Sequence, residues 1–183
     1  MLNSIHPDAV IGEYCQIGHF TTIYEDVIIG KNNWIGPNVT IFPGTRIGDN
    51  CSIFPGAVIG AIPQDLKFEG EYSTVEIANR VTIRECVTIN RGTKISGTTK
   101  IGSDTLLMAY VHVAHDCIVG NHCVLANTTN LAGHVTIGDY AIFGGMSAAH
   151  QPRTLLQAAV IMARSSNKAS ASSKVGSPCS TRR

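Results

Sequence analysis

A six-residue period in large aliphatic residues runs through most of this 183-residue chain. Between residues 5 and 143, 24 positions fall at this spacing, and 22 of them are large and apolar. The column begins at Ile5, is interrupted at Asp65 and Glu71, and resumes from Ile77 to Phe143. Six is neither the period of an α-helix nor the alternation of a single strand, so the pattern indicates a repeat architecture.

A second column of smaller residues lies four positions after the first. Its members are small or β-branched: Ala9, Cys15, Thr21, Val27, Val81, Val87, Thr93, Val111, Cys117, Cys123, Val135 and Ala141. β-Branched residues suit a short strand, whereas Gly, Asn and Asp, which recur between the columns, suit a corner. Each hexad therefore predicts one strand and one corner, and its two inward residues are buried only when successive coils stack.

The repeat resembles the left-handed parallel β-helix of hexapeptide-repeat acyltransferases, in which three hexads form one coil. The left hand is implied by that resemblance, since the general rule for parallel crossovers favours the right hand. Residues eighteen apart then stack about 4.8 Å apart on successive coils. We expect an all-β chain of eight coils with one excursion loop, at about residues 61–74, and an irregular C-terminal tail. The same count places Ile95 in the buried column.

Charge divides the chain into two parts. Residues 1–151 carry eight basic and thirteen acidic residues, whereas residues 152–183 carry six basic residues, seven serines and no acid. Such a composition is typical of disorder, so we expect a β-helix domain over residues 1–151 and a disordered basic tail over residues 152–183. Basic tails also occur in segments that bind nucleic acid or anionic lipid. Our prediction for this chain is nevertheless that it has no nucleic-acid partner.

Several protein classes do not fit this sequence. No run of eighteen apolar residues is present, so no membrane span is expected. The first ten residues, MLNSIHPDAV, lack the basic and apolar regions of a secretory signal, and we expect a cytoplasmic protein. The six cysteines contain no CxxC pair, which favours core thiols in a reducing compartment over a metal site. We predict neither a metal nor a cofactor.

The histidine-rich run VHVAHDC lies late in the repeat. The six-residue phase makes Val113 and Cys117 the inward pair, so His112, His115 and Asp116 face outward or sit at a corner. An exposed corner histidine is the simplest interpretation of His115. Neighbouring residues in a strand point in opposite directions, so Asp116 can orient His115 only if the corner turns its side chain back.

Stacking gives this run a second meaning. Eighteen residues above His115 is Gly133 and eighteen below is Gly97, so bare backbone is expected on both sides, and His134 lies above Asp116. In acyl transfer a general base takes a hydroxyl proton, and a peptide N–H receives the oxyanion. Imidazole suits the base because the unperturbed pKa of histidine, about 6.5, is close to working pH. The pattern therefore favours an acyl-transfer site.

Specific runs resemble the UDP-N-acetylglucosamine O-acyltransferase family of lipid A synthesis. These are QDLKFEGE, IRECVTINRGT, GSDTLLMAYVHVAHDCIVGNHC, LANTTNLAGHVTIGDYAIFGGM and SAAHQ. The resemblance covers residues 1–151. It implies transfer of a 3-hydroxyacyl chain from acyl carrier protein to the 3-hydroxyl of UDP-N-acetylglucosamine. It also implies a homotrimer with active sites between neighbouring prisms.

The same resemblance assigns roles to individual residues. His115 matches the general base, Asp116 its neighbouring carboxylate and Gly133 the backbone donor to the oxyanion. Residues that match the substrate-binding positions are Gln64, Asp65, Lys67, His112, His134, His150 and Gln151. The match stops after Gln151, and we expect a truncation or a change of reading frame there. The coils implied to gauge acyl length are then missing.

Two other functions fit parts of the pattern. Hexapeptide prisms also host a zinc carbonic anhydrase, whose three histidines are imitated here by His112, His115 and His134. That interpretation leaves the QDLK run unexplained, and a zinc site needs an open fourth ligand position. The third interpretation is an inactive structural fragment that assembles with intact subunits.

Overall fold

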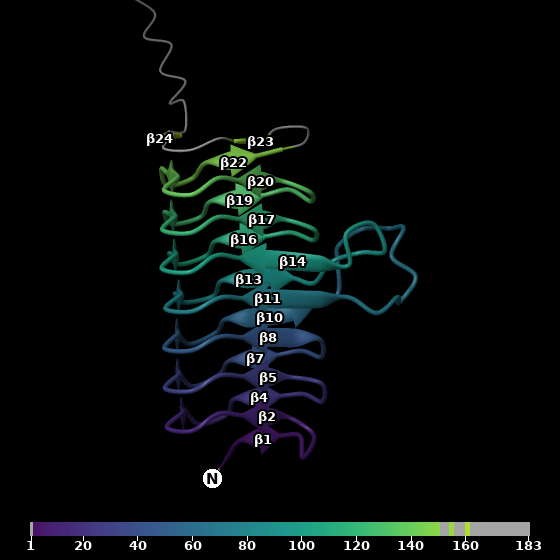
Figure 1. The fold of residues 1–183 in the computed structure, drawn as a ribbon, viewed down its shortest axis with the longest axis vertical. Helices are drawn as coiled ribbons and strands as arrows, with labels where there is room; N and C mark the ends of the chain where they lie inside the picture. The colour runs from purple at the N-terminus through teal and green to yellow at the C-terminus, as the bar shows by residue number, and fades with distance from the viewer. Residues whose placement is uncertain (1, 151–153, 156–159, 162–183) are drawn as a thin grey trace, which may run out of the picture.

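The computed structural model describes residues 2–150, 154–155 and 160–161. Over these residues the chain forms short strands and no helix, and it winds into an upright prism (Figure 1). Three parallel sheets of eight strands each form its walls, and successive strands occupy the three walls in turn. The fold is the predicted left-handed parallel β-helix. None of the described segments forms a helix with the length and apolarity needed to cross a membrane.

Each wall is a ladder of two- to four-residue strands. Sheet A contains β1 (Ser4–Ile5), β4 (Thr22–Ile23), β7 (Thr40–Ile41), β10 (Val58–Ala61), β13 (Thr88–Asn90), β16 (His112–Val113), β19 (Asn130–Leu131) and β22 (Ala148–Ala149). Sheet B contains β2 (Val10–Ile11), β5 (Ile28–Ile29), β8 (Thr45–Ile47), β11 (Thr74–Ile77), β14 (Thr98–Ile101), β17 (Ile118–Val119), β20 (Thr136–Ile137) and β23 (Thr154–Leu155). Sheet C contains β3 (Gln16–Ile17), β6 (Trp34–Ile35), β9 (Ser52–Ile53), β12 (Thr82–Ile83), β15 (Leu106–Leu107), β18 (Val124–Leu125), β21 (Ile142–Phe143) and β24 (Val160–Ile161).

The core is a narrow aliphatic axis. The second residue of most strands points into it, and matching residues stack directly, as Ile23 does on Ile41. Small inward residues such as Val27 and Val111 fill the space beside the large ones and are fully buried. Since a coil buries these side chains only against the coils above and below, stability comes from stacking.

The predicted first excursion is confirmed. Ile47 pairs with Ile77 instead of a residue eighteen positions on, so twelve residues leave the prism without disturbing the register. They form the first loop, residues 62–73, between β10 and β11.

A second excursion was not predicted. Ile77 pairs with Ile101, 24 positions later, because residues 91–97 between β13 and β14 form a second loop. The prediction that Ile95 lies in the buried column was wrong, since Ile95 is 72% exposed. An insertion of six residues keeps the phase of a six-residue repeat, so the aliphatic count cannot detect it.

This loop also changes the number of coils. Three of the 24 counted positions, Asp65, Glu71 and Ile95, lie in loops, so residues 5–143 form seven coils and not eight. The eighth coil begins with β22, and β23 and β24 pair with β20 and β21 of the coil below. The rest of the tail predicted to be disordered, and Gln151, lie outside the described residues.

Both loops leave the same edge of the prism, the one between sheets A and B, which we call the site edge. They form the lobe that projects to one side in Figure 1. On the coils above the second loop, the same edge carries the turns at residues 114–117 and 132–135. The histidine run is thus placed directly above the two loops.

Two isoleucines of the six-residue column, one buried and one in the second loop, test this arrangement by comparison. Ile53 is fully buried, so Ile53→Ala is expected to lower the free energy of unfolding by about 2–5 kcal/mol. Ile95→Ala, at an exposed loop position, is expected to change it by less than about 0.5 kcal/mol. Urea unfolding followed by far-ultraviolet circular dichroism measures both. Equal losses in the two variants would contradict the second loop.

Candidate active site

A cleft of about 500 Å³ lies on the site edge, between the first loop and the turns above it. Its lining residues are Gln64, Asp65, Leu66, Lys67, His115, Ala132, Gly133, His134 and His150. Most of the predicted site residues therefore converge on one surface, although they come from segments up to 86 positions apart. Asp116 lies behind this surface, and Gln151 is outside the described residues.

His115 and Asp116 form a hydrogen-bonded pair. Their Nδ1 and Oδ2 atoms are 2.8 Å apart, and the side chain of His115 is 13% exposed whereas that of Asp116 is fully buried. Asp116 has a φ of 59°, a left-handed conformation that Asp adopts more readily than most residues. This corner turns the carboxylate back beside the imidazole, as it must if Asp116 is to orient His115. Of the two positions expected for Asp116, facing outward or at a corner, the structure shows the corner, and the second loop covers the side chain.

The second loop supplies most of the partners of this carboxylate. Oδ1 accepts the Thr93 N–H at 2.9 Å and the Ser96 hydroxyl, and Oδ2 accepts the Thr93 hydroxyl at 2.6 Å. The backbone N–H of Asp116 donates to Thr99 Oγ1 at 2.8 Å. Burial by itself raises the pKa of Asp116, but the hydrogen bonds from Ser96, Thr93 and His115 outweigh it and lower the pKa to about 2.

These contacts fix how His115 presents its ring. An ionised carboxylate only accepts hydrogen bonds, so Nδ1 of the neutral imidazole carries the proton and donates it toward Asp116. Nε2 is then the atom with the available lone pair. The pair therefore has the arrangement of an oriented general base.

Gly133 lies against the other side of the imidazole, as the eighteen-residue stacking predicts. A Cβ at this position would lie 2.5 Å from both Cε1 and Nε2 of His115, so only glycine leaves room for the ring. The His134 N–H donates to the His115 carbonyl at 3.0 Å and joins the two coils. The predicted stacking of Gly97 below His115 was wrong, because Gly97 lies in the second loop and a Cβ there would meet nothing within 4 Å.

His134 and His112 occupy different surroundings. The His134 ring stands edge-on to that of His115, with centroids 5.0 Å apart, and its Nδ1 is 3.7 Å from Asp116 Oδ2. His112 lies on sheet A, where its Nδ1 is 2.7 Å from the Thr88 hydroxyl and burial lowers its pKa. The structure does not bring His112 into the cleft lining.

A zinc site of three histidines finds no support in this geometry. Among the described residues, the group whose donor atoms lie within 4.8 Å of one another is His115, Asp116 and His134, without His112. Both Asp116 oxygens already accept hydrogen bonds from the second loop. In a metal site the ligand atoms surround the ion, whereas the oxygens of this carboxylate accept hydrogen bonds from donor groups.

The first loop is held in place by the end of β13 and by the second loop. Asn90 Nδ2 donates to the Ile62 carbonyl at 2.9 Å, and the Lys94 N–H donates to Glu71 Oε1 at 2.9 Å. The Arg91 guanidinium lies over the Phe68 ring, 5.6 Å from its centroid. These contacts keep residues 64–67 facing the histidines across the cleft.

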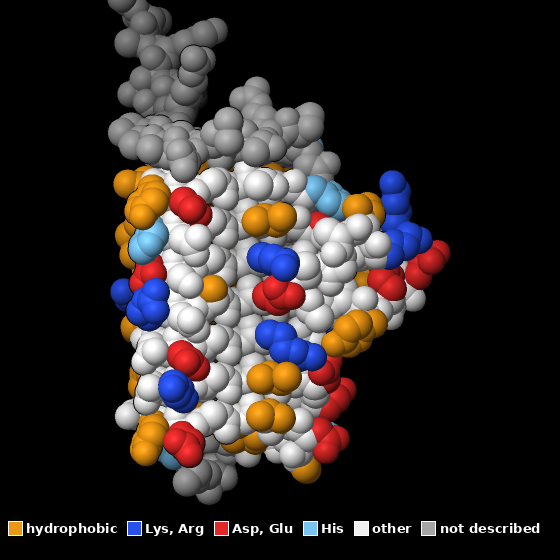
Figure 2. All heavy atoms as spheres, viewed as in Figure 1, with side chains coloured by type: hydrophobic (Ala, Val, Ile, Leu, Met, Phe, Trp, Pro, Cys, Tyr) orange, Lys and Arg blue, Asp and Glu red, His pale blue; other side chains and the backbone are white. Residues whose placement is uncertain are grey.

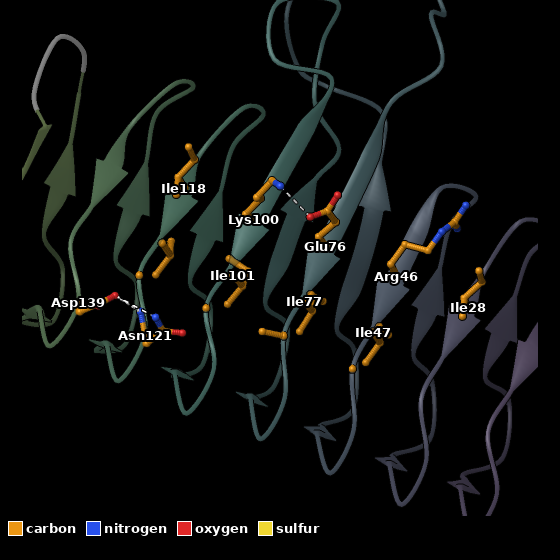
Figure 3. Close-up of a pocket in the computed structure, with 15 residues that line it drawn as sticks. Ile28, Arg46, Ile47, Glu76, Ile77, Lys100, Ile101, Ile118, Asn121 and Asp139 are labelled. Carbon is orange, nitrogen blue, oxygen red and sulfur yellow. Dashed lines mark hydrogen bonds and ion pairs between the residues drawn. The ribbon is translucent and has the colours of Figure 1, made fainter.

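A larger hollow of about 660 Å³ lies on the outer face of sheet B. In Figure 2 this face shows hydrophobic side chains at both ends of a column and charged side chains between them. Lys100 pairs with Glu76 at 2.9 Å, and the exposed Ile28 and Ile118 flank them (Figure 3). Arg46 is likewise paired, with Asp26, and the lining of the hollow contains no histidine, so we assign the chemistry to the smaller cleft.

The described cysteines are free thiols, in agreement with the sequence prediction. Burial raises the pKa of Cys117, directly after Asp116, to about 11. Its thiol stays protonated at neutral pH and is no nucleophile for this cleft.

Comparison with known proteins supports the same assignment. The bacterial transferase hexapeptide (six repeats) family matches residues 8–42, 26–61 and 98–133. Two curated relatives are acyl-[acyl-carrier-protein]–UDP-N-acetylglucosamine O-acyltransferases. That of Campylobacter concisus is 44% identical over 149 residues, which are 80% of this chain and 57% of the relative. That of Xylella fastidiosa is 51% identical over 154 residues, which are 80% and 59% of the two chains.

Solved structures agree with these relatives. The UDP-N-acetylglucosamine acyltransferase LpxA of Bacteroides fragilis is 53% identical, with a TM-score of 0.81, over 82% of this chain and 59% of that one. LpxA of Acinetobacter baumannii is 46% identical, with a TM-score of 0.81, over 82% and 58%. The chain thus spans about three fifths of the length of the relatives it matches.

A β-helix of hexapeptide repeats with a histidine–carboxylate pair on one edge defines a hexapeptide-repeat transferase. Within that class, the relatives and the solved structures support an LpxA-type acyltransferase, since the chain is similar to the acyl-[acyl-carrier-protein]–UDP-N-acetylglucosamine O-acyltransferases over about four fifths of its length.

The buried carboxylate predicts a pH-dependent stability. Because the pKa of Asp116 is lower in the folded chain, its contribution, about 2 kcal/mol, is fully present above the ordinary value near 3.8 and is lost as pH falls toward 2. The difference in unfolding free energy between the chain and Asp116→Asn is expected to be constant above pH 5 and to shrink below pH 4. Urea unfolding at each pH measures it. A difference that does not change between pH 6 and pH 3 would argue against an ionised, hydrogen-bonded carboxylate.

Gly133 offers a direct test of the stacking. Gly133→Ala is expected to displace the His115 ring, because the added methyl group would collide with Cε1 and Nε2. A matched control is Gly145→Ala at another edge of the prism, in the turn between β21 and β22, where the nearest atom to a Cβ is the Asn127 carbonyl oxygen at 3.4 Å. The ¹H–¹³C resonance of His115 Cε1 should move in the first variant and stay in place in the second. An unmoved resonance in Gly133→Ala would show that the two residues are not in contact.

Proposed function

We propose that this chain transfers a 3-hydroxyacyl group from acyl carrier protein to the 3-hydroxyl of UDP-N-acetylglucosamine, an early step of lipid A synthesis. The observation that carries the proposal is the position of His115, between an ionised carboxylate and the backbone of Gly133, in a cleft faced by the QDLK loop. The names of the relatives supply the substrates.

The proposed chemistry uses the ring as a proton carrier. The sugar hydroxyl gives its proton to Nε2 of His115 as its oxygen attacks the acyl thioester carbonyl. Asp116 stabilises the imidazolium that forms, and the Gly133 N–H is the proposed donor to the tetrahedral oxyanion. Collapse of this intermediate breaks the C–S bond, and the imidazolium returns the proton to the departing sulfur.

Substrate binding is assigned to both sides of the cleft. Gln64, Asp65 and Lys67 face the histidines from the first loop, and Lys67 supplies a cation suited to a nucleotide diphosphate. His134 and His150 line the opposite wall, and His112 and Gln151 complete the set implied by family resemblance.

A homotrimer is part of the proposal. The outer face of sheet B carries a hollow in which the exposed Ile28 and Ile118 lie at the two ends of a column of charged side chains, and a neighbouring prism would cover this face. Sedimentation velocity of the full chain tests it, and a monomer at micromolar concentration would contradict it.

A second candidate role is that of an inactive structural fragment that assembles with intact subunits. Incubation of the full chain with UDP-N-acetylglucosamine and 3-hydroxyacyl carrier protein separates the two roles. Formation of the acylated sugar nucleotide supports the enzyme, and its absence under saturating substrates supports the fragment.

His115→Ala is expected to lower kcat by about a hundredfold or more, because it removes the general base. The matched control is His122→Ala. His122 stacks on Tyr140 on a different edge of the prism, so this variant should keep kcat within about twofold. Steady-state turnover with both substrates measures these values. Normal turnover in His115→Ala would remove this residue from the role of base.

A further inference from the structure

The second loop interrupts the repeat where it meets Asp116. Its seven residues leave after β13 and return at β14 in the original phase. Gly92 closes the neck of the loop, since a Cβ there would lie 2.3 Å from the Thr98 nitrogen. Beyond this neck, the loop contacts the coil above through Thr93 and Ser96.

The two hydroxyls of this loop are used differently from those at regular corners. Thr21 and Thr105 donate to backbone carbonyls fifteen positions away, at 2.8 and 3.0 Å, and so tie one coil to the next. Thr93 and Ser96 instead donate to the side chain of Asp116.

The orientation of these donors is itself constrained. Thr93 Oγ1 accepts the Ile95 N–H at 3.3 Å, which directs its own hydrogen toward Asp116 Oδ2. The Ser96 hydroxyl lies between Asp116 Oδ1 and the Thr98 carbonyl, the latter at 3.1 Å. Three of the four hydrogen bonds that the carboxylate accepts come from this loop, and the fourth comes from His115.

We propose that Thr93 and Ser96 are positioning residues, which lock the Asp116 carboxylate so that the His115 proton stays on Nδ1 and Nε2 stays aimed into the cleft. Neither Thr93 nor Ser96 lines the cleft, so neither would contact a substrate bound there. The expected loss of kcat rests on the proposed acyl transfer. The expected change in the tautomer of the His115 imidazole does not.

Four variants of the full chain test this role. Thr93→Val keeps the shape and removes the hydroxyl, Ser96→Ala removes the other, and a double variant removes both. Thr93→Ser restores a hydroxyl and serves as the rescue. Thr105→Val is the matched control, because it removes a buried hydroxyl at another edge of the prism.

In turnover assays, Thr93→Val and Ser96→Ala are each expected to lower kcat about tenfold, and the double variant further. The KM for UDP-N-acetylglucosamine should change less than twofold. Thr93→Ser and Thr105→Val should retain kcat within twofold. Unchanged kcat in the double variant, or an equal loss in Thr105→Val, would overturn the proposal.

The ¹⁵N shifts of the His115 ring supply a readout that does not depend on turnover, with the signals assigned by their loss in His115→Gln. The unmodified chain should show a protonated Nδ1 at neutral pH, and the double variant a mixture with protonated Nε2. An unchanged tautomer in the double variant would overturn the positioning role. If the unmodified chain forms no product, the proposed function fails, and the tautomer comparison still decides this inference.

Discussion

The backbone hydrogen bonds between strands of this chain run along the axis of the prism, from each coil to the next. The Ala114 N–H donates to Leu131, for example, and the Ala132 N–H donates to Ala149. Since these bonds set the coil spacing near 4.8 Å, residues at one corner of adjacent coils are held within side-chain reach. The contact between His115 and Gly133 is a direct product of this spacing.

The regular coils fix the positions of the site residues, and the two loops that interrupt the repeat provide groups for binding and catalysis. At a regular corner, the hydroxyl and amide groups form hydrogen bonds with the next coil. They are therefore not used to hold a carboxylate in place. At the site edge two loops depart on successive coils, one facing the histidines across a cleft and the other covering Asp116. Loops on a rigid scaffold are where binding and catalytic groups are commonly found. The site therefore combines a fixed imidazole with segments free to differ from the repeat.

Particular residues show how far the sequence leads. The six-residue period was enough to predict the aliphatic axis and the first loop. The three walls and the stacking of Gly133 on His115 also required the family resemblance, which implies three hexads per coil. The period failed at Ile95, because an insertion of one full period leaves the phase intact. The hydrogen bonds from Thr93 and Ser96 to Asp116 were not predicted, for the same reason. A signal was present: Gly92 and Gly97 bracket four residues, three of them polar, and Gly97 adopts a φ of 74° that suits a turn.

The central claim is that the site-edge cleft presents His115 to a bound sugar nucleotide. Titration of the full chain with UDP-N-acetylglucosamine, followed by the ¹H–¹³C resonances of histidine Cε1, tests it most directly. We expect saturable shifts for His115 and His134, and none for His19 and His122, which lie on other edges. No shift at His115 under saturating ligand, or an equal shift at His122, would contradict it.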